Sequence, residues 1–124
     1  MRKSASSKSF SDGDLSIQVN STPYKLKLVW TGRSVARDPG VMLAPFFNDL
    51  EELLGSDCDV EIDFRRFEYM NSSTLKPIIR FVQFASERSR TVQVVYDAQK
   101  SWQRLSFKLL SAVAGSLDNV RVDH

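Results

Sequence analysis

Four consecutive side chains that form hydrogen bonds, Asn71, Ser72, Ser73 and Thr74, stand directly before an apolar pattern with helical spacing. Residues of these types favour helix N-termini, because their side-chain oxygens accept hydrogen bonds from backbone N–H groups that lack a partner within the helix. A hydroxyl in this position also lies where those N–H groups and the helix dipole favour an anion. The segment therefore fits two interpretations: a helix cap with a solvated first turn, or a site that accepts a phosphate.

A phosphate at this helix end would change any surface that docks over it. It adds about −1.5 to −2 charge near neutral pH, and Arg65, Arg66 and Lys76 are close enough in sequence to be its partners. A hydrolase that uses Ser72 or Ser73 with Lys76 is disfavoured, since no histidine or second base stands at a useful spacing. We therefore expect a protein without enzymatic activity.

The remaining composition excludes several other classes of function. The chain has 124 residues with one cysteine, Cys58, and one histidine, His124, which disfavours disulfides, multi-cysteine metal sites and histidine-dependent catalysis. Seventeen basic and fifteen acidic residues leave a net charge of +2, which is too small for the basic face of a nucleic-acid-binding domain. Neither a membrane-spanning run nor a signal peptide is evident. We expect a cytoplasmic protein that uses no cofactor, no metal, no nucleic acid and no membrane.

The apolar patterns predict one folded domain over residues 14–124, after a mobile tail at residues 1–13. The order of elements is ββαβαβαβ. The strands centre on Leu15–Val19, Tyr24–Trp30, Cys58–Phe64, Val92–Tyr96 and Val120–Val122; the helices run from Pro39 toward Gly55, from about Ser72 to Arg88, and from about Ser101 toward Gly115. We expect the last helix to bury Trp102, Leu105, Leu109, Ala112 and Val113, and to turn Gln103 outward.

Three carboxylates on one strand indicate how these elements are layered. Asp59, Glu61 and Asp63 alternate with apolar residues, so they share one face of their strand. Burying unpaired charges costs several kcal/mol each, hence that face of the sheet must be largely wet. Lys25 and Lys27 share a wet face that is able to pair with it. The prediction is a two-layer α/β fold, with a mixed sheet and all helices on its other face.

The segment Phe67–Leu75, following the strand Val60–Phe64, resembles the signature of STAS domains of the anti-sigma factor antagonist type, and the order of elements agrees. Asn71 stands where that family has Asp, and Thr74 stands where it has Gly. The resemblance, which is greatest to small stand-alone bacterial STAS-like regulators, covers roughly residues 14–124. It implies that Ser72 is phosphorylated by a histidine-kinase-like serine kinase that also acts as an anti-sigma factor, and is dephosphorylated by a PP2C-type phosphatase. Ser73 and Thr74 are the alternative acceptors, and Asn71 is the helix cap.

A second strip on the same helix suggests a surface for protein partners. Pro77, Phe81 and Phe84 project away from the expected core stripe and, with Lys76, continue from the serine-rich end. Two interpretations stay open, a docking face or a strip covered by a neighbouring helix or by the tail. The sequence thus predicts a partner switch in transcription control, acting as an anti-sigma factor antagonist. The alternatives are a regulator of another output enzyme, such as a diguanylate cyclase, and an unmodified scaffold.

Overall fold

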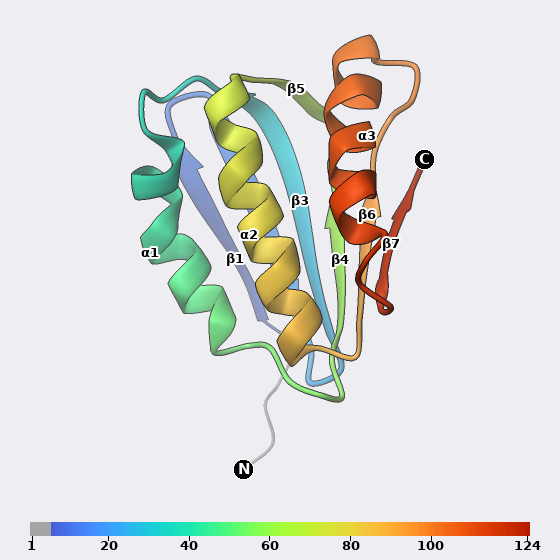
Figure 1. Ribbon diagram of the computed structural model, residues 1–124. Coiled ribbons are helices and arrows are strands. Elements are labelled where there is room, and N and C mark those ends of the chain that lie inside the picture. Colours follow the sequence, from blue (N-terminus) through green and yellow to red (C-terminus); the bar gives the residue numbers. More distant parts are fainter. Residues whose placement is uncertain (1–5) are drawn as a thin grey trace.

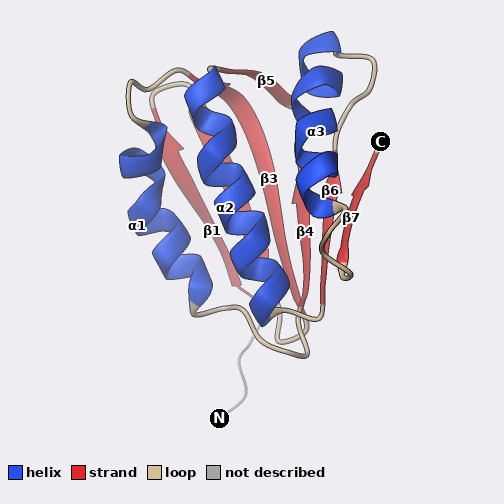
Figure 2. Ribbon diagram, in the orientation of Figure 1, coloured by secondary structure: helices blue, strands red, loops and turns tan. Residues whose placement is uncertain are grey.

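The computed structural model describes residues 6–124 and shows a mixed sheet with helices on one face only (Figures 1 and 2). The strands are β1 (Ser6–Asp12), β2 (Leu15–Ser21), β3 (Lys25–Ser34), β4 (Asp59–Asp63), β5 (Phe67–Met70), β6 (Thr91–Val95) and β7 (Val120–Asp123). The helices are α1 (Pro39–Glu51), α2 (Ser72–Arg88) and α3 (Ser101–Ala114). The predicted two-layer α/β fold is therefore confirmed.

The sheet has the order β1-β2-β3-β4-β6-β7. β1, β2 and β3 are antiparallel neighbours, whereas β4, β6 and β7 continue the sheet in parallel. The short strand β5, which the sequence patterns do not predict, pairs in parallel with the end of β3 beyond the part that β4 occupies. β5 thus leads the chain from the end of β3 directly into α2.

The prediction of a tail is wrong for residues 6–12, which form strand β1 along β2, while residues 1–5 lie outside the described part of the chain. A two-residue turn at Gly13 and Asp14 joins the strands, and Gly13 has a φ of +58°, a conformation that suits glycine. The Phe10 ring packs 4.9 Å from that of Phe46 on α1. An edge strand needs little apolar surface, because backbone hydrogen bonds to the neighbouring strand hold it in place. The polar composition of this segment therefore did not indicate that it forms a strand.

A second glycine, Gly32, stands where the pairing of β3 with β2 ends and its pairing with β5 begins. It has a φ of +80°, and the pairing between β3 and β5 shifts between Gly32 and Arg33. A Cβ at this position would collide with the carbonyl oxygen of Asp14, so the close approach of the two strands requires glycine.

The outer face of the sheet carries the predicted ion pairs of Lys25 and Lys27 with β4, and also an ion pair of Arg90 with Asp59 that the sequence patterns do not predict. Arg90 and Thr91 hydrogen-bond to the Asp59 carboxylate and lower its pKa to about 2. Burial by itself would raise the pKa of Glu61, but Lys25 and Lys27, 3.2 and 3.4 Å away, bring it below its usual value. The carboxylates of Asp59 and Glu61 are therefore neutralised by basic side chains from other segments of the chain.

The buried face of α3 differs from the predicted one. Gln103, Phe107, Leu110 and Ala114 are buried, whereas Leu105 and Leu109 remain 66% and 60% exposed. Gln103 explains this rotation of the helix. Its side-chain amide donates to the carbonyls of Phe64 and Phe67, at 2.6 and 2.8 Å, and its oxygen accepts from the Asp97 N–H at 2.8 Å. One polar side chain therefore turns inward and anchors α3 to the turn between β4 and β5.

Candidate functional site

The first turn of α2 begins immediately after β5, at one end of the layer of helices (Figure 1). Ser72 and Ser73 occupy its first two positions, and both side chains are exposed. The hydroxyl that the family resemblance assigns as the phosphate acceptor is thus open to solvent. This geometry is compatible with access by a modifying enzyme.

Thr74, the third predicted acceptor, is fully buried and belongs to the supporting structure instead. Its hydroxyl donates to Oδ1 of Asn71 at 2.7 Å and lies 2.8 Å from the hydroxyl of Ser34 at the end of β3. Because the single proton of Thr74 goes to Asn71, Ser34 must donate in the second bond. The prediction of Thr74 as an alternative acceptor is wrong, because a phosphate at this buried position would displace the strand beneath it.

Asn71 precedes the helix, as predicted, but its side chain makes no capping hydrogen bond to the helix backbone. Its oxygen accepts from Thr74, and its amide group donates to the carbonyl of Ala36 at 2.8 Å. The Asn71 N–H donates to the carbonyl of Ser34 at 3.0 Å. Asn71 therefore ties the start of α2 to β3 and to the segment before α1, and it leaves the first N–H groups of the helix uncapped by its side chain.

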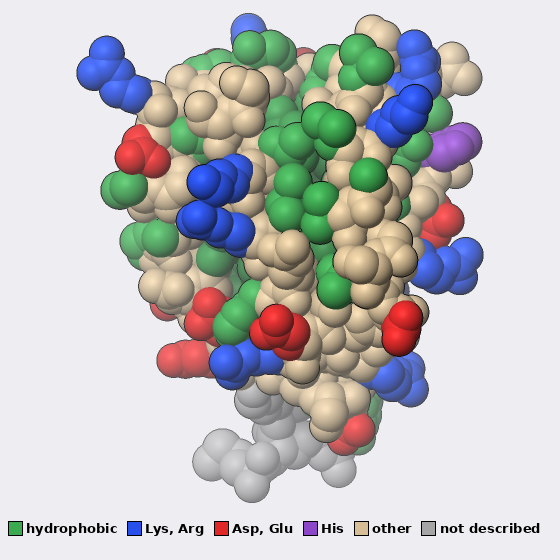
Figure 3. All heavy atoms as spheres, viewed as in Figure 1, with side chains coloured by type: hydrophobic (Ala, Val, Ile, Leu, Met, Phe, Trp, Pro, Cys, Tyr) green, Lys and Arg blue, Asp and Glu red, His purple; other side chains and the backbone are tan. Residues whose placement is uncertain are grey.

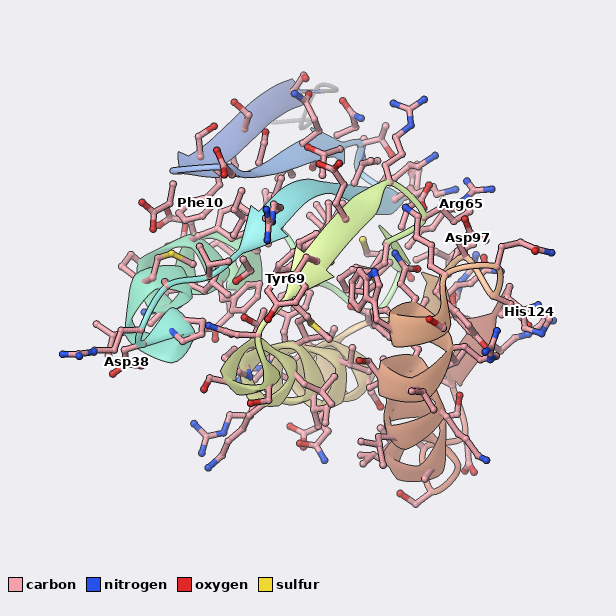
Figure 4. The ribbon with its side chains drawn as sticks, turned by 90° about the horizontal axis from the view of Figure 1, so that it is seen from above. Phe10, Asp38, Arg65, Tyr69, Asp97 and His124 are labelled. Atoms are coloured by element: carbon pink, nitrogen blue, oxygen red, sulfur yellow. The ribbon has the colours of Figure 1, made fainter. Side chains whose placement is uncertain are left out.

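The structure separates the predicted phosphate partners. Lys76 is exposed on α2, one turn after Ser72. Arg65 instead forms an ion pair of 2.8 Å with Asp63, and it points to the outer side of the sheet, away from α2 (Figure 4). Arg66 lines a polar depression on that same side, together with Lys27 and Asp63. Of these three basic residues, only Lys76 lies on the helix that carries Ser72.

Arg33 is a basic residue near this end of α2 that no local pattern indicates. Its guanidinium group lies 5.3 Å from the ring centre of Tyr69, its partner in the pairing of β3 with β5. Tyr69 is 41% exposed and lies close to the beginning of α2 in the view from above (Figure 4). Arg33 and Ser72 are far apart in sequence, so only the unpredicted strand β5 reveals this arrangement.

The predicted docking strip on α2 faces α1 and is partly covered by it. Phe81 is only 5% exposed, and its ring stacks on that of Phe47 at 4.7 Å. For Phe81 the second interpretation, coverage by a neighbouring helix, is therefore confirmed, and its assignment as a partner-binding residue is wrong. Pro77 and Phe84 are half-buried and line a groove between the two helices. The Arg88 guanidinium covers the Phe84 ring at 4.3 Å. The groove retains an apolar floor with Phe84 and Pro77 accessible at its α2 side.

Two further observations concern other kinds of site. Among residues 6–124, no group of three or more histidine, cysteine, aspartate or glutamate side chains is arranged to hold a metal ion. Within the same range, none of the helices combines the length and the apolar character that a membrane span requires.

Comparisons with known proteins bear on the fold. No family model and no curated protein matches the sequence. Among solved structures, SiaC of Pseudomonas aeruginosa matches with a TM-score of 0.63 and 15% sequence identity, over 96% of this chain and 99% of that chain. A structure of the diguanylate cyclase SiaD in complex with its activator SiaC, from the same organism, matches with a TM-score of 0.62 and 15% identity, over 94% and 99% of the two chains. The fold is STAS-like. The likeness to SiaC covers nearly all of both chains, so it concerns the fold as a whole.

Proposed function

We propose that this protein is a non-enzymatic regulator that binds an output enzyme, of the diguanylate cyclase class, and controls its activity. The observation that carries the proposal is the exposed Ser72 at the start of α2, in a fold that agrees with SiaC from end to end. SiaC is described as the activator of the diguanylate cyclase SiaD. This likeness favours the cyclase alternative over the anti-sigma factor antagonist role that the sequence motif suggests.

Phosphorylation of Ser72 is the proposed control. A histidine-kinase-like serine kinase adds the phosphate and a PP2C-type phosphatase removes it. The uncapped N–H groups of the first turn and Lys76 are positioned to stabilise the added charge without unfolding of the domain. Ser73 is the alternative acceptor, since it is the other exposed hydroxyl in this turn.

The partner is proposed to dock over the beginning of α2 and the adjoining groove toward α1, on Lys76, Pro77 and Phe84. A phosphate forced into an apolar contact without a matching partner costs several kcal/mol. A change from 99% bound to 1% bound requires about 5.5 kcal/mol. One phosphate at Ser72 is therefore of the right magnitude to release a partner while the fold stays unchanged.

The first test is the mass of the intact protein isolated from its native host, for wild type and for Ser72→Ala and Ser73→Ala. A gain of one phosphate that disappears in Ser72→Ala, and persists in Ser73→Ala, supports the proposal. Wild-type protein that carries no phosphate under any growth condition refutes the phosphorylation.

The second test measures the activity of diguanylate cyclases of the same host with the purified protein added. We expect stimulation by the unphosphorylated protein, and loss of stimulation with Ser72→Asp and with Phe84→Asp. Circular dichroism must show that both variants keep the fold. Cyclase activities that do not respond to the wild-type protein contradict the proposed output.

A further inference from the structure

The outer side of α3 carries an apolar seam that the core of this chain covers only at one end, at Trp102. Trp102, Leu105, Leu109 and Ala112 follow one another at intervals of three, four and three residues. Leu105 and Leu109 are 66% and 60% exposed, although the core already takes another face of the same helix. Trp102 is half-buried and packs against the core, with its ring 5.6 Å from that of Phe67, whereas Leu105, Leu109 and Ala112 are exposed. The exposed part of this face is therefore left over after the core is formed.

The spacing of the seam is that of a coiled coil, in which apolar residues alternate at intervals of three and four along one side of a helix. Leu75 and Ile79, two half-buried residues of α2, lie beside the seam. Pro77 and Phe84 face α1, so Leu75 and Ile79, on the opposite flank of α2, face α3. Hydrophobic side chains accordingly gather between α2 and α3 on this side of the molecule (Figure 3).

Basic residues border the seam on both sides. Lys76 and Arg80 are exposed on the outer ridge of α2, and Arg104 and Lys108 are exposed on α3. Blue side chains flank the central hydrophobic area in the space-filling view (Figure 3). A second copy of this chain placed against the same face would bring these basic residues together, which disfavours self-association through it.

We infer that the seam, defined as Trp102, Leu105, Leu109 and Ala112 with Leu75 and Ile79, binds an amphipathic helix of a protein partner whose apolar stripe is bordered by acidic residues. The intervals of three and four match the apolar stripe of an amphipathic helix, and the basic borders favour acidic residues beside that stripe. The inference rests on the proposed function only in taking the occupant to be a protein, and it does not depend on Ser72.

The test places a photo-crosslinking amino acid at position 109 of the full-length chain in its native host, and identifies the crosslinked peptide by mass spectrometry. A second chain with the crosslinker at Gln18, exposed on the outer face of the sheet, is the control. We expect a crosslink from position 109 alone, to a helical segment with apolar residues at intervals of three and four and acidic neighbours. A crosslink to lipid, to a second copy of this chain or to a segment of another type overturns the inference, as does the absence of any crosslink.

A synthetic peptide of the crosslinked segment then gives the affinity. The double change Leu105→Glu with Leu109→Glu is expected to weaken binding at least about 30-fold, because it removes two exposed anchors and adds like charge. Val41→Glu, at a 70% exposed position on α1, is the matched control and should leave the affinity unchanged. Both variants should melt like wild type, since neither alters a buried residue.

Unchanged affinity in the double variant overturns the inference. Failure of the inference about the seam and failure of the proposed function give different results. Unchanged affinity of the seam variants for the crosslinked helix refutes only the seam, if the wild-type protein gains its phosphate at Ser72 and stimulates the cyclase without it. A seam that binds its helix in a protein that never gains a phosphate refutes only the switch.

Discussion

Replacement of Thr74 by valine separates its structural role from the predicted role as an acceptor. The change keeps the shape of the side chain but removes the hydroxyl that joins Ser34 to Asn71, through contacts of 2.8 and 2.7 Å. The lost hydrogen bond to Asn71 costs about 1 kcal/mol, and loss of the bond to Ser34, a residue only 1% exposed, costs about 1–3 kcal/mol because the Ser34 hydroxyl is left buried and unpaired. We expect Thr74→Val to lower the free energy of unfolding by about 2–4 kcal/mol.

The measurement is urea unfolding at neutral pH, followed by circular dichroism. Thr74→Ser is the matched variant, because it keeps the hydroxyl and loses only a methyl group, at a cost of about 1 kcal/mol. A Thr74→Val protein as stable as wild type, or a Thr74→Ser protein destabilised just as much, would refute the hydrogen-bond network as the source of stability.

The same variant tests the position of the phosphate. Thr74→Val protein that remains folded in the native host should still gain a phosphate on Ser72, because Thr74 is fully buried. Loss of all phosphate from a folded Thr74→Val protein would contradict this argument and return Thr74 to the set of acceptors.

Three further changes test the supporting structure. Gly32→Ala should destabilise the protein clearly more than Gly13→Ala, because both glycines have positive φ but only at Gly32 would a methyl group collide with the backbone; equal losses in thermal melts would contradict this. Gln103→Leu should lower the free energy of unfolding by about 3 kcal/mol, since it removes two buried hydrogen bonds and one part-buried one. A change below about 1 kcal/mol in urea would show that α3 is held otherwise. The ion pair of Asp59 with Arg90 lowers the pKa of Asp59 to about 2, so its contribution to stability is complete above about pH 4 and disappears as the pH falls toward 2. Between pH 5 and pH 2 wild type should therefore lose more stability than Arg90→Gln, and parallel losses would show that the pair does not stabilise the fold.

Local patterns were sufficient for most of the sheet and for the beginning of each helix. Asp38 accepts a hydrogen bond from the Val41 N–H at 3.3 Å and Pro39 begins α1, as the local residue types predict. Alternation in β4 predicted a polar outer face that pairs with Lys25 and Lys27. These features depend on neighbours along the chain or on the period of two in a strand, both of which are present in the sequence.

The site itself was only partly predictable. The exposed serines at the start of α2 follow from the change of pattern at Asn71. The burial of Thr74 depends on Ser34, forty positions earlier in the chain, and the stacking of Phe81 depends on α1. Contacts between residues this far apart have no local pattern, so sequence interpretation left the exposure of these side chains open.

Helix α3 shows most directly what the sequence determined and what only the tertiary structure decided. The sequence determined that α3 is a helix with two apolar stripes, one through Leu105 and Leu109 and one through Phe107 and Leu110. Hydrophobicity favoured burial of the first, because Gln103 interrupts the second. The tertiary structure reversed that choice, since the carbonyls of Phe64 and Phe67 and the N–H of Asp97 satisfy the Gln103 amide in the core. A buried amide is costly only without partners, and these partners exist only after β4, β5 and α3 have come together.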